Sequence, residues 1–224
     1  ITHYNCKKTN GTIITNEIEI KKELNALNLT IDKIIQPALN ALLLKLNCTN
    51  YNTKGGAGYI QWDGLVRSIR EECCGEHWEK YEYKGIEGII SRNEKGRKSR
   101  IIPSSGNSAT ANQNQPPSNK NPKGFKTIEL INNSQQGSLF YGFPNQIEDS
   151  ITDTYILLYY NNSKELRLEL SIPSHITKAG RIVSWSKRII IPPIKLDEVE
   201  IYNRQQKEPL IEDEIDIPIK RKNI

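Results

Sequence analysis

Residues 154–172 have the sequence TYILLYYNNSKELRLELSI, which carries the clearest β-strand signal in the chain. The first half is rich in β-branched and aromatic residues, and the second half alternates charged with apolar residues. The polar residues 161–164 between the halves are typical of a turn. The stretch therefore predicts an antiparallel hairpin with one buried face, whose charged side chains face solvent or pair with one another. Residues 181–185 and 188–191 predict one or two further strands.

The N-terminal region is expected to be helical. Residues 17–47 place apolar side chains at three- and four-residue steps, which is typical of one helical face, and Pro37 divides them into two short helices or one bent helix. A second amphipathic helix is expected over residues 63–80, after a flexible break at Gly55–Gly58. A short helix is expected to begin at Thr127.

Together these patterns predict an α+β fold in which an N-terminal helical layer packs on a C-terminal antiparallel sheet, with a long basic loop between them. A chain of 224 residues suits one domain. The expected regions of that domain, 1–224, are a mainly helical region (1–91), a basic flexible loop (92–126), a mainly β region (127–202) and a charged tail (203–224). Short extended pieces are also expected at 85–90 and 100–103.

The predicted loop 92–126 concentrates positive charge. It contains eight Lys or Arg and one acid, Glu94, so its net charge is +7, whereas the whole chain is +5 and the remainder is therefore −2. The eight basic residues are Arg92, Lys95, Arg97, Lys98, Arg100, Lys120, Lys123 and Lys126. The centre of the loop, Ser104–Pro122, has almost no apolar residues, so we expect it to be exposed and without fixed packing.

A concentrated positive charge on a flexible segment favours a polyanionic partner, above all nucleic acid. The eight basic side chains would contact phosphates, and the backbone N–H groups of Ser104–Asn107 could form an anion-binding nest. Four cysteines give no disulfide framework, and no apolar run is long enough to cross a bilayer. The sequence therefore favours a cytoplasmic nucleic-acid-binding protein without a membrane partner.

The hairpin offers an alternative, a metal-dependent nuclease of the restriction or defence type. Its candidate catalytic residues are Asp153, Glu165, Arg167 and Glu169. Carboxylates from two neighbouring strands can hold Mg²⁺ beside a scissile phosphate, so Mg²⁺ would be the cofactor of such an enzyme. In such nucleases a lysine follows the second carboxylate by two residues and orients the attacking water. Here that position is Arg167 after Glu165, or Ser171 after Glu169. The alternation of charged and apolar residues also fits any half-exposed strand. We therefore expect the four residues to be structural.

A third hypothesis is a protein–protein adaptor. The basic loop would then dock an acidic partner, or fold back on the acidic residues 197–216. No metal site is predicted, because the cysteines and histidines lack Cys-x-x-Cys spacing. The three hypotheses differ in nucleic-acid affinity and in cleavage, and the sequence does not determine the oligomeric state.

Overall fold

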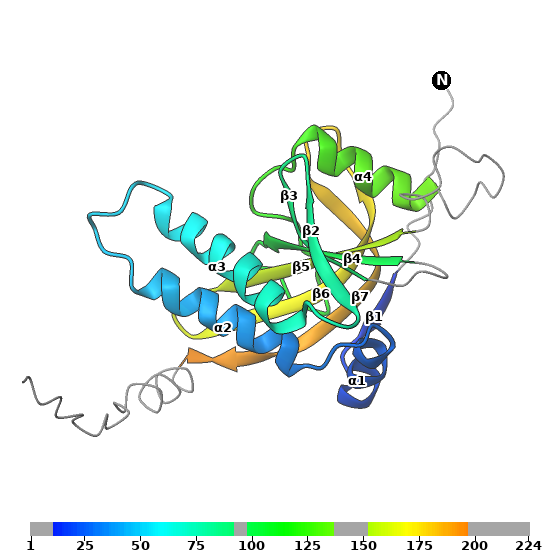
Figure 1. Ribbon diagram of the computed structural model, residues 1–224, viewed down its shortest axis with the longest axis horizontal. Coiled ribbons are helices and arrows are strands. Elements are labelled where there is room, and N and C mark those ends of the chain that lie inside the picture. Colours follow the sequence, from blue (N-terminus) through cyan, green and yellow to red (C-terminus); the bar gives the residue numbers. More distant parts are fainter. Residues whose placement is uncertain (1–10, 92–97, 137–151, 197–224) are drawn as a thin grey trace, which may run out of the picture.

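A computed structural model of the chain describes residues 11–91, 98–136 and 152–196 (Figure 1). In chain order the elements are β1 (Thr12–Ile14), α1 (Glu17–Ala26), α2 (Asp32–Leu46), α3 (Gly56–Cys73), β2 (Trp78–Tyr83), β3 (Ile86–Ser91), β4 (Lys98–Ser105), α4 (Phe125–Gln136), β5 (Thr152–Asn161), β6 (Glu165–Ile176) and β7 (Ile182–Lys195). The strands form one seven-stranded sheet in the order β1-β7-β6-β5-β4-β3-β2. The predicted mixture of helices and strands is confirmed.

The sheet is mixed, so the prediction of an antiparallel sheet is wrong at two pairings. β4 pairs parallel with β5, and β1 pairs parallel with β7, whereas all other neighbours are antiparallel. β4 comes from the stretch predicted to be a loop, in which only residues 100–103 were expected to be extended. Its Ile101 and Ile102 are buried, and the chain returns from β4 to β5 through a connection that contains α4. Because parallel strands need such a crossover connection, the hairpin signal could not reveal this pairing.

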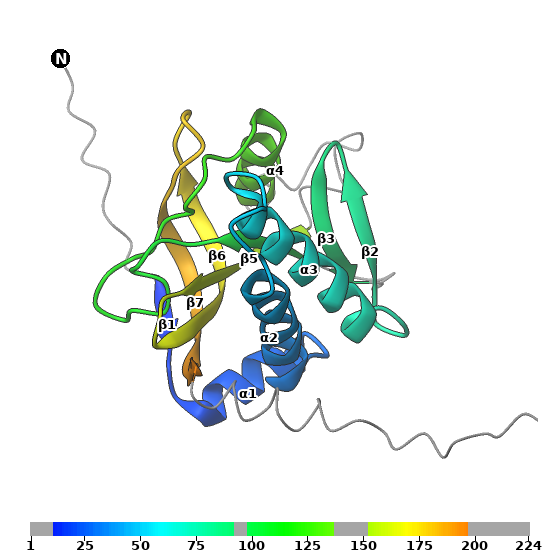
Figure 2. The same cartoon turned by 90° about the vertical axis from the view of Figure 1, so that its left-hand side faces the viewer.

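Helices α1, α2 and α3 cover one face of the sheet (Figures 1 and 2). Their apolar side chains, such as Leu42 and Leu65, join a cluster with Leu168 and Leu170 of β6. A second cluster lies on the other face, where Ile131 of α4 packs with residues of β5 and β7. Strands of the sheet are therefore covered on both faces.

The helix predictions hold in part. Residues 17–47 do form two helices, but the division between them falls between Ala26 and Asp32 and not at Pro37, which lies inside α2. The flexible break at Gly55–Gly58 is wrong, because α3 begins at Gly56 and already ends at Cys73. The region predicted to be mainly helical also contains β1, β2 and β3. Trp78 begins β2, and its buried indole N–H donates to the Leu27 carbonyl, 3.0 Å away, which ties this strand to the end of α1.

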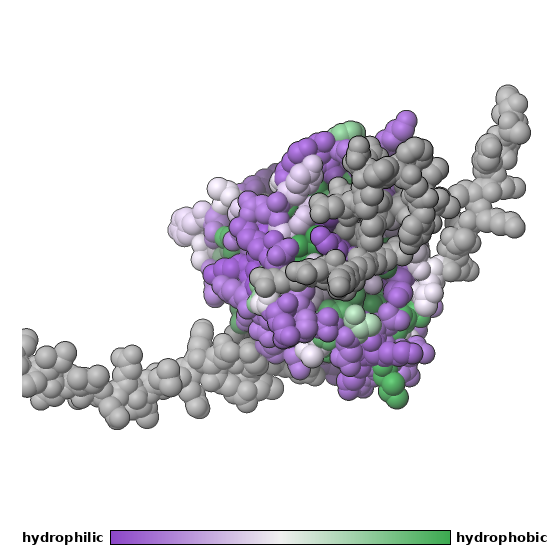
Figure 3. Space-filling view, turned by 45° about the vertical axis from the view of Figure 1, so that its right-hand side comes forward, coloured by the Kyte–Doolittle hydropathy of each residue, from purple (hydrophilic) through white to green (hydrophobic). Residues whose placement is uncertain are grey.

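The face in Figure 3 is covered mainly by hydrophilic residues, among which hydrophobic residues form small patches. Such scattered exposed apolar residues are normal on a folded domain. Among the described residues, no helix combines the length and the apolar character that a membrane span needs.

Candidate functional site

The segment 106–124 follows β4 and lies on the sheet face opposite to α1–α3. Asn119 fixes it there: its side-chain oxygen accepts from the Ile182 N–H at 2.8 Å, and its side-chain nitrogen donates to the Gly180 carbonyl at 2.8 Å. Trp185 donates its indole N–H to the Pro117 carbonyl at 2.9 Å. The 106–124 segment is therefore attached to β7 and to the turn between β6 and β7.

The prediction that Ser104–Pro122 is exposed and without fixed packing is wrong about the packing, although residues 107–108, 113–116 and 120–122 are exposed. Thr110 is fully buried, and the exposed fractions of Asn119 and Ala109 are 1% and 4%. The prediction failed because a polar segment can be covered without apolar anchors when its polar groups find hydrogen-bond partners. Thr110 illustrates this, since its buried hydroxyl donates to the Asn107 carbonyl at 2.8 Å.

A buried ion pair lies beneath the 106–124 segment. Glu169 of β6 is 0% exposed and Arg188 of β7 is 4% exposed, with Nη2 to Oε2 at 2.6 Å and Nε to Oε1 at 3.2 Å. The Ser171 hydroxyl donates to the same carboxylate at 2.9 Å, and the Ala111 N–H donates to it at 2.8 Å. The carboxylate of Glu169 is therefore fully engaged in joining β6, β7 and the 106–124 segment.

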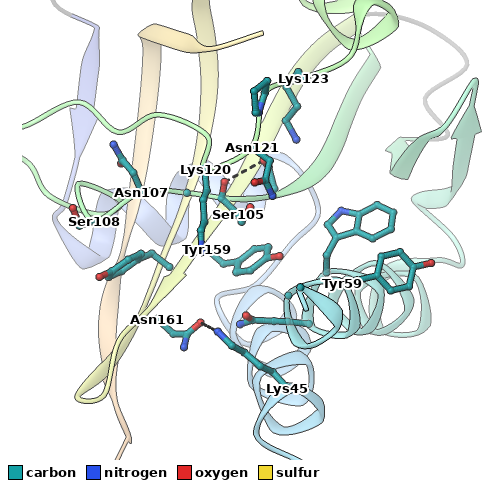
Figure 4. A pocket seen from close by; sticks show the side chains of 18 residues that line it. Lys45, Tyr59, Ser105, Asn107, Ser108, Lys120, Asn121, Lys123, Tyr159 and Asn161 are labelled. Atoms are coloured by element: carbon teal, nitrogen blue, oxygen red, sulfur yellow. Dashed lines mark hydrogen bonds between the residues drawn. The ribbon is translucent and has the colours of Figure 1, made fainter. Parts of the chain in front are cut away.

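A cavity of about 960 Å³, called the pocket below, lies at the C-terminal ends of β4 and β5. These ends meet at one edge of the sheet because the two strands are parallel. The pocket is bounded by the strand ends, by the 106–124 segment and by the first turns of α3 (Figure 4). Its lining includes three lysines (Lys45, Lys120 and Lys123) and four aromatic residues (Tyr59, Trp62, Tyr159 and Tyr160).

The three lysines give the pocket an unbalanced positive charge. Lys45 comes from the end of α2, and its Nζ donates to the side-chain oxygen of Asn161 at 3.0 Å. Burial, and then the nearby charge of Lys120, lowers the pKa of Lys45. Burial also lowers the pKa of Lys123 to about 8. None of the described residues that line the pocket is an Asp or a Glu. A bound anion would therefore supply the charge compensation that the lining lacks.

Three other described residues of the predicted basic surface, Lys98, Arg100 and Lys126, lie outside the pocket. Arg100 is 2% exposed and its guanidinium lies 4.4 Å from the ring centre of Tyr81, so it is not positioned for contact with a phosphate in solution. Lys98 begins β4, about 23 Å along the strand from Ser105 at its end. Lys126 lies on α4 and pairs with Glu129 at 2.9 Å. Of the five predicted residues that the structure describes, only Lys120 and Lys123 line the pocket. Arg92, Lys95 and Arg97 lie outside the described residues.

The candidate catalytic residues do not meet at one point. Glu165 pairs with Arg167 at 2.5 Å, whereas Glu169 pairs with Arg188. Asp153 is the second residue of β5, while Glu169 pairs with Leu158, five residues or about 16 Å farther along that strand. Within residues 11–91, 98–136 and 152–196, no group of three or more His, Cys, Asp or Glu is placed to hold a metal ion.

The predicted anion nest at Ser104–Asn107 does not form. The Gly106 N–H donates to the Tyr159 carbonyl at 2.8 Å, and the Asn107 N–H donates to the Ser118 carbonyl at 2.9 Å. These backbone groups hold the 106–124 segment against β5 instead. The lysine side chains provide the charged donors of the pocket.

Sequence reasoning missed Lys45, Tyr59 and Tyr160 as site residues. Lys45 precedes Lys120 by 75 positions, and no local pattern links them. A usable signal existed for the aromatic residues: Tyr59 and Trp62 are three residues apart in one helix, where they lie on the same face. The ring centres are 5.8 Å apart.

No protein family, curated protein or solved structure matches the chain. What the pocket binds must therefore follow from its own chemistry. That chemistry consists of lysine ammonium groups, aromatic rings and side-chain amides at one edge of the sheet.

Proposed function

We propose that the protein binds nucleic acid in the pocket and that Lys45, Lys120 and Lys123 contact its phosphates. The observation that carries the proposal is the convergence of these three lysines, from two distant stretches of the chain, without an acidic residue in the described lining. Lysines brought together without carboxylates repel one another, and burial adds a desolvation penalty. A bound phosphate would offset both effects.

The proposed binding site is preformed, whereas the sequence predicted a flexible basic loop. The contact residues stand on fixed supports: Lys45 on α2, and Lys120 on a segment whose backbone is bonded to Ser105 and to Arg181. The Lys120 N–H donates to the Ser105 carbonyl at 2.8 Å, and Arg181 donates to the Lys120 carbonyl at 2.7 Å. A preformed site loses less conformational freedom on binding than a flexible loop does.

Nucleic acid is favoured over a simple anion because the pocket combines cations with aromatic rings and amides. Phosphates attract ammonium groups, whereas bases offer flat faces and hydrogen-bonding edges. Tyr59, Trp62 and Tyr160 are all at least partly exposed, and Asn107 and Asn121 are exposed. The lysines of such a site fix the position of the backbone without specifying a base.

The proposal can be tested by fluorescence anisotropy with a labelled oligonucleotide over a range of salt concentrations. We expect the double variant Lys120→Gln/Lys123→Gln to bind more weakly, with a salt slope smaller in magnitude by about two, because each lost phosphate contact removes about one unit. Lys126→Gln is the matched control, since Lys126 is close in sequence but pairs with Glu129 outside the pocket lining.

Equal affinity and equal salt slope in the wild type and the double variant would contradict the proposal. Polyglutamate serves as the competitor that separates nucleic acid from an acidic protein partner. If polyglutamate displaced the oligonucleotide at the same charge concentration, the adaptor hypothesis would account for the pocket better.

A further inference from the structure

We infer that the pocket takes unpaired nucleotides of a single strand, with a base stacked on the aromatic surface of Tyr59 and Trp62. The inference rests on the proposed function and names its substrate class. The lysines and the pair Tyr59 and Trp62 line the pocket from different elements, and they are called its lysine side and its aromatic side below. Lys45 and Lys120 approach it from α2 and the 106–124 segment, whereas Tyr59 and Trp62 belong to α3 (Figure 4).

The aromatic side consists of an exposed ring, Tyr59, next to a ring that is fixed against the sheet, Trp62. Trp62 is half-buried, and its indole N–H donates to the Pro103 carbonyl of β4 at 3.3 Å, which fixes the ring against the sheet. Tyr59 is 64% exposed, and its ring is tilted by 44° to that of Trp62. An exposed tyrosine beside a positioned tryptophan offers a stacking platform for a flat, apolar face.

The position of this surface favours a nucleotide over a phosphate alone. Tyr59 and Trp62 line the same cavity as the lysines, so a ligand that fills the pocket meets both sides. A cavity of about 960 Å³ is near the upper end of the range in which proteins enclose small ligands. The pocket therefore has room for a base together with its sugar and phosphate.

A nucleic-acid duplex cannot contact the lysines and stack a base on the aromatic rings at the same time. Its phosphates are accessible to lysines, but its base faces are covered by the neighbouring base pairs. In a single strand the bases can turn outward and stack on aromatic side chains. Because every base has a flat face, stacking of this kind tolerates all sequences, and we expect little base preference.

The decisive probe is an abasic oligonucleotide, which keeps the phosphates and removes the bases. We compare a labelled thymidine oligonucleotide of about ten residues, the abasic strand of the same length, and the corresponding duplex. The single strand is expected to bind about 5- to 150-fold more tightly than the abasic strand, as one stacked base predicts. Tyr59→Ala should remove most of this difference, whereas Tyr51→Ala should retain it. Tyr51 is the matched control, because it is fully exposed in the connection before α3 and does not line the pocket.

The outcomes separate the inference from the proposed function. Equal binding of the normal and abasic strands, or of single strand and duplex, would overturn the single-strand inference while leaving phosphate binding in place. Failure of all three probes to bind would overturn the proposed function itself. Competition by thymidine monophosphate as strong as that by the oligonucleotide would assign the pocket to free nucleotides and also overturn the inference. Trp62→Phe, which keeps a ring, provides a second variant and should bind the single strand more tightly than Trp62→Ala.

Discussion

At the scale of single residues, burial makes Glu169 important for the stability of the fold. The alternating pattern of β6 predicted a charged side chain that faces solvent or pairs with another charged side chain of the hairpin. The carboxylate of Glu169 is instead buried, and it accepts from Arg188, Ser171 and Ala111. We expect Glu169→Ala to lower the free energy of unfolding by about 3–5 kcal/mol, because it leaves Arg188 buried without its partner. Urea unfolding measures this loss.

The control for this prediction is Glu165→Ala, at the start of the same strand. Glu165 also pairs with an arginine, but both side chains remain about a quarter exposed, so the expected loss is about 1 kcal/mol or less. Replacing the whole buried pair, as in Glu169→Met/Arg188→Met, should lose less than Glu169→Ala alone. Equal small losses for Glu165→Ala and Glu169→Ala would contradict the structural role of the pair.

Lys123 gives the pocket a dependence on pH. Burial lowers its pKa to about 8, and Lys45 and Lys120 line the same pocket, so an anion binds best while Lys123 is protonated. We expect oligonucleotide affinity to fall several-fold between about pH 7 and pH 9 in the wild type, and much less in Lys123→Gln. Lys45→Gln is the control, because the pKa of Lys45 is also lowered and its contribution must be separated.

The titration of Lys123 affects the stability of the fold in the opposite direction: rising pH weakens binding but increases stability. The pKa of Lys123 in the folded chain lies below the value of about 10.4 in the unfolded chain, so between these values the unfolded state holds more protons. The contribution of Lys123 therefore raises stability as the pH rises through this range. A pH dependence of binding that is unchanged in Lys123→Gln would contradict the assignment of the titration to this residue.

At the scale of elements, the turn between β6 and β7 positions one wall of the pocket. Gly180 has a φ of +75°, and its carbonyl accepts from the Lys123 N–H at 2.9 Å. A Cβ at this position would lie 2.2 Å from the Lys123 carbonyl oxygen, so Gly180→Ala must displace the backbone of Lys123. We expect a loss of stability of more than about 1 kcal/mol together with weaker oligonucleotide binding.

Gly85→Ala is a close control for the turn. Gly85 has a φ of +77° in the turn between β2 and β3, but no atom lies within 4 Å of an added Cβ. The strain of the left-handed backbone is therefore the same in both variants, and only Gly180→Ala disturbs the pocket. Equal loss of binding in the two variants would show that Gly180 does not act through Lys123.

The elements also show what the sequence could predict. The hairpin 154–172, the helical character of residues 17–47, and α4 all have periodic or turn-flanked patterns that depend on neighbouring residues. The pairing of β4 with β5 has no such pattern, because residues 106–151 separate the two strands. The sequence also could not predict that the polar 106–124 segment covers one face of β6. Alternation indicates two faces, but it does not tell whether a polar face meets water or another polar segment.

At the scale of the whole molecule, the candidate site contains only part of the predicted basic surface. Lys120 and Lys123 were among the expected contact residues, whereas Arg100 was expected at the surface and is buried. The net charge of the sequence segment predicted that the eight basic residues form one patch. In the fold, the five of them that the structure describes are distributed over β4, the 106–124 segment and α4. Lys45 and Tyr59 join the site only because α2 and α3 pack beside the ends of β4 and β5.

Binding in a preformed pocket should also stabilise the whole fold. A ligand that binds only the folded chain, at 100 times its Kd, adds about 2.7 kcal/mol to the free energy of unfolding. For a chain of 224 residues this corresponds to a rise in Tm of about 5–11 °C, which thermal unfolding with and without a thymidine oligonucleotide measures. The double variant Lys120→Gln/Lys123→Gln at the same ligand concentration should show a much smaller rise, and Lys126→Gln should behave as the wild type. If the double variant kept the full rise, the stabilising site would lie outside the pocket, because an oligonucleotide bound elsewhere would not depend on these two lysines.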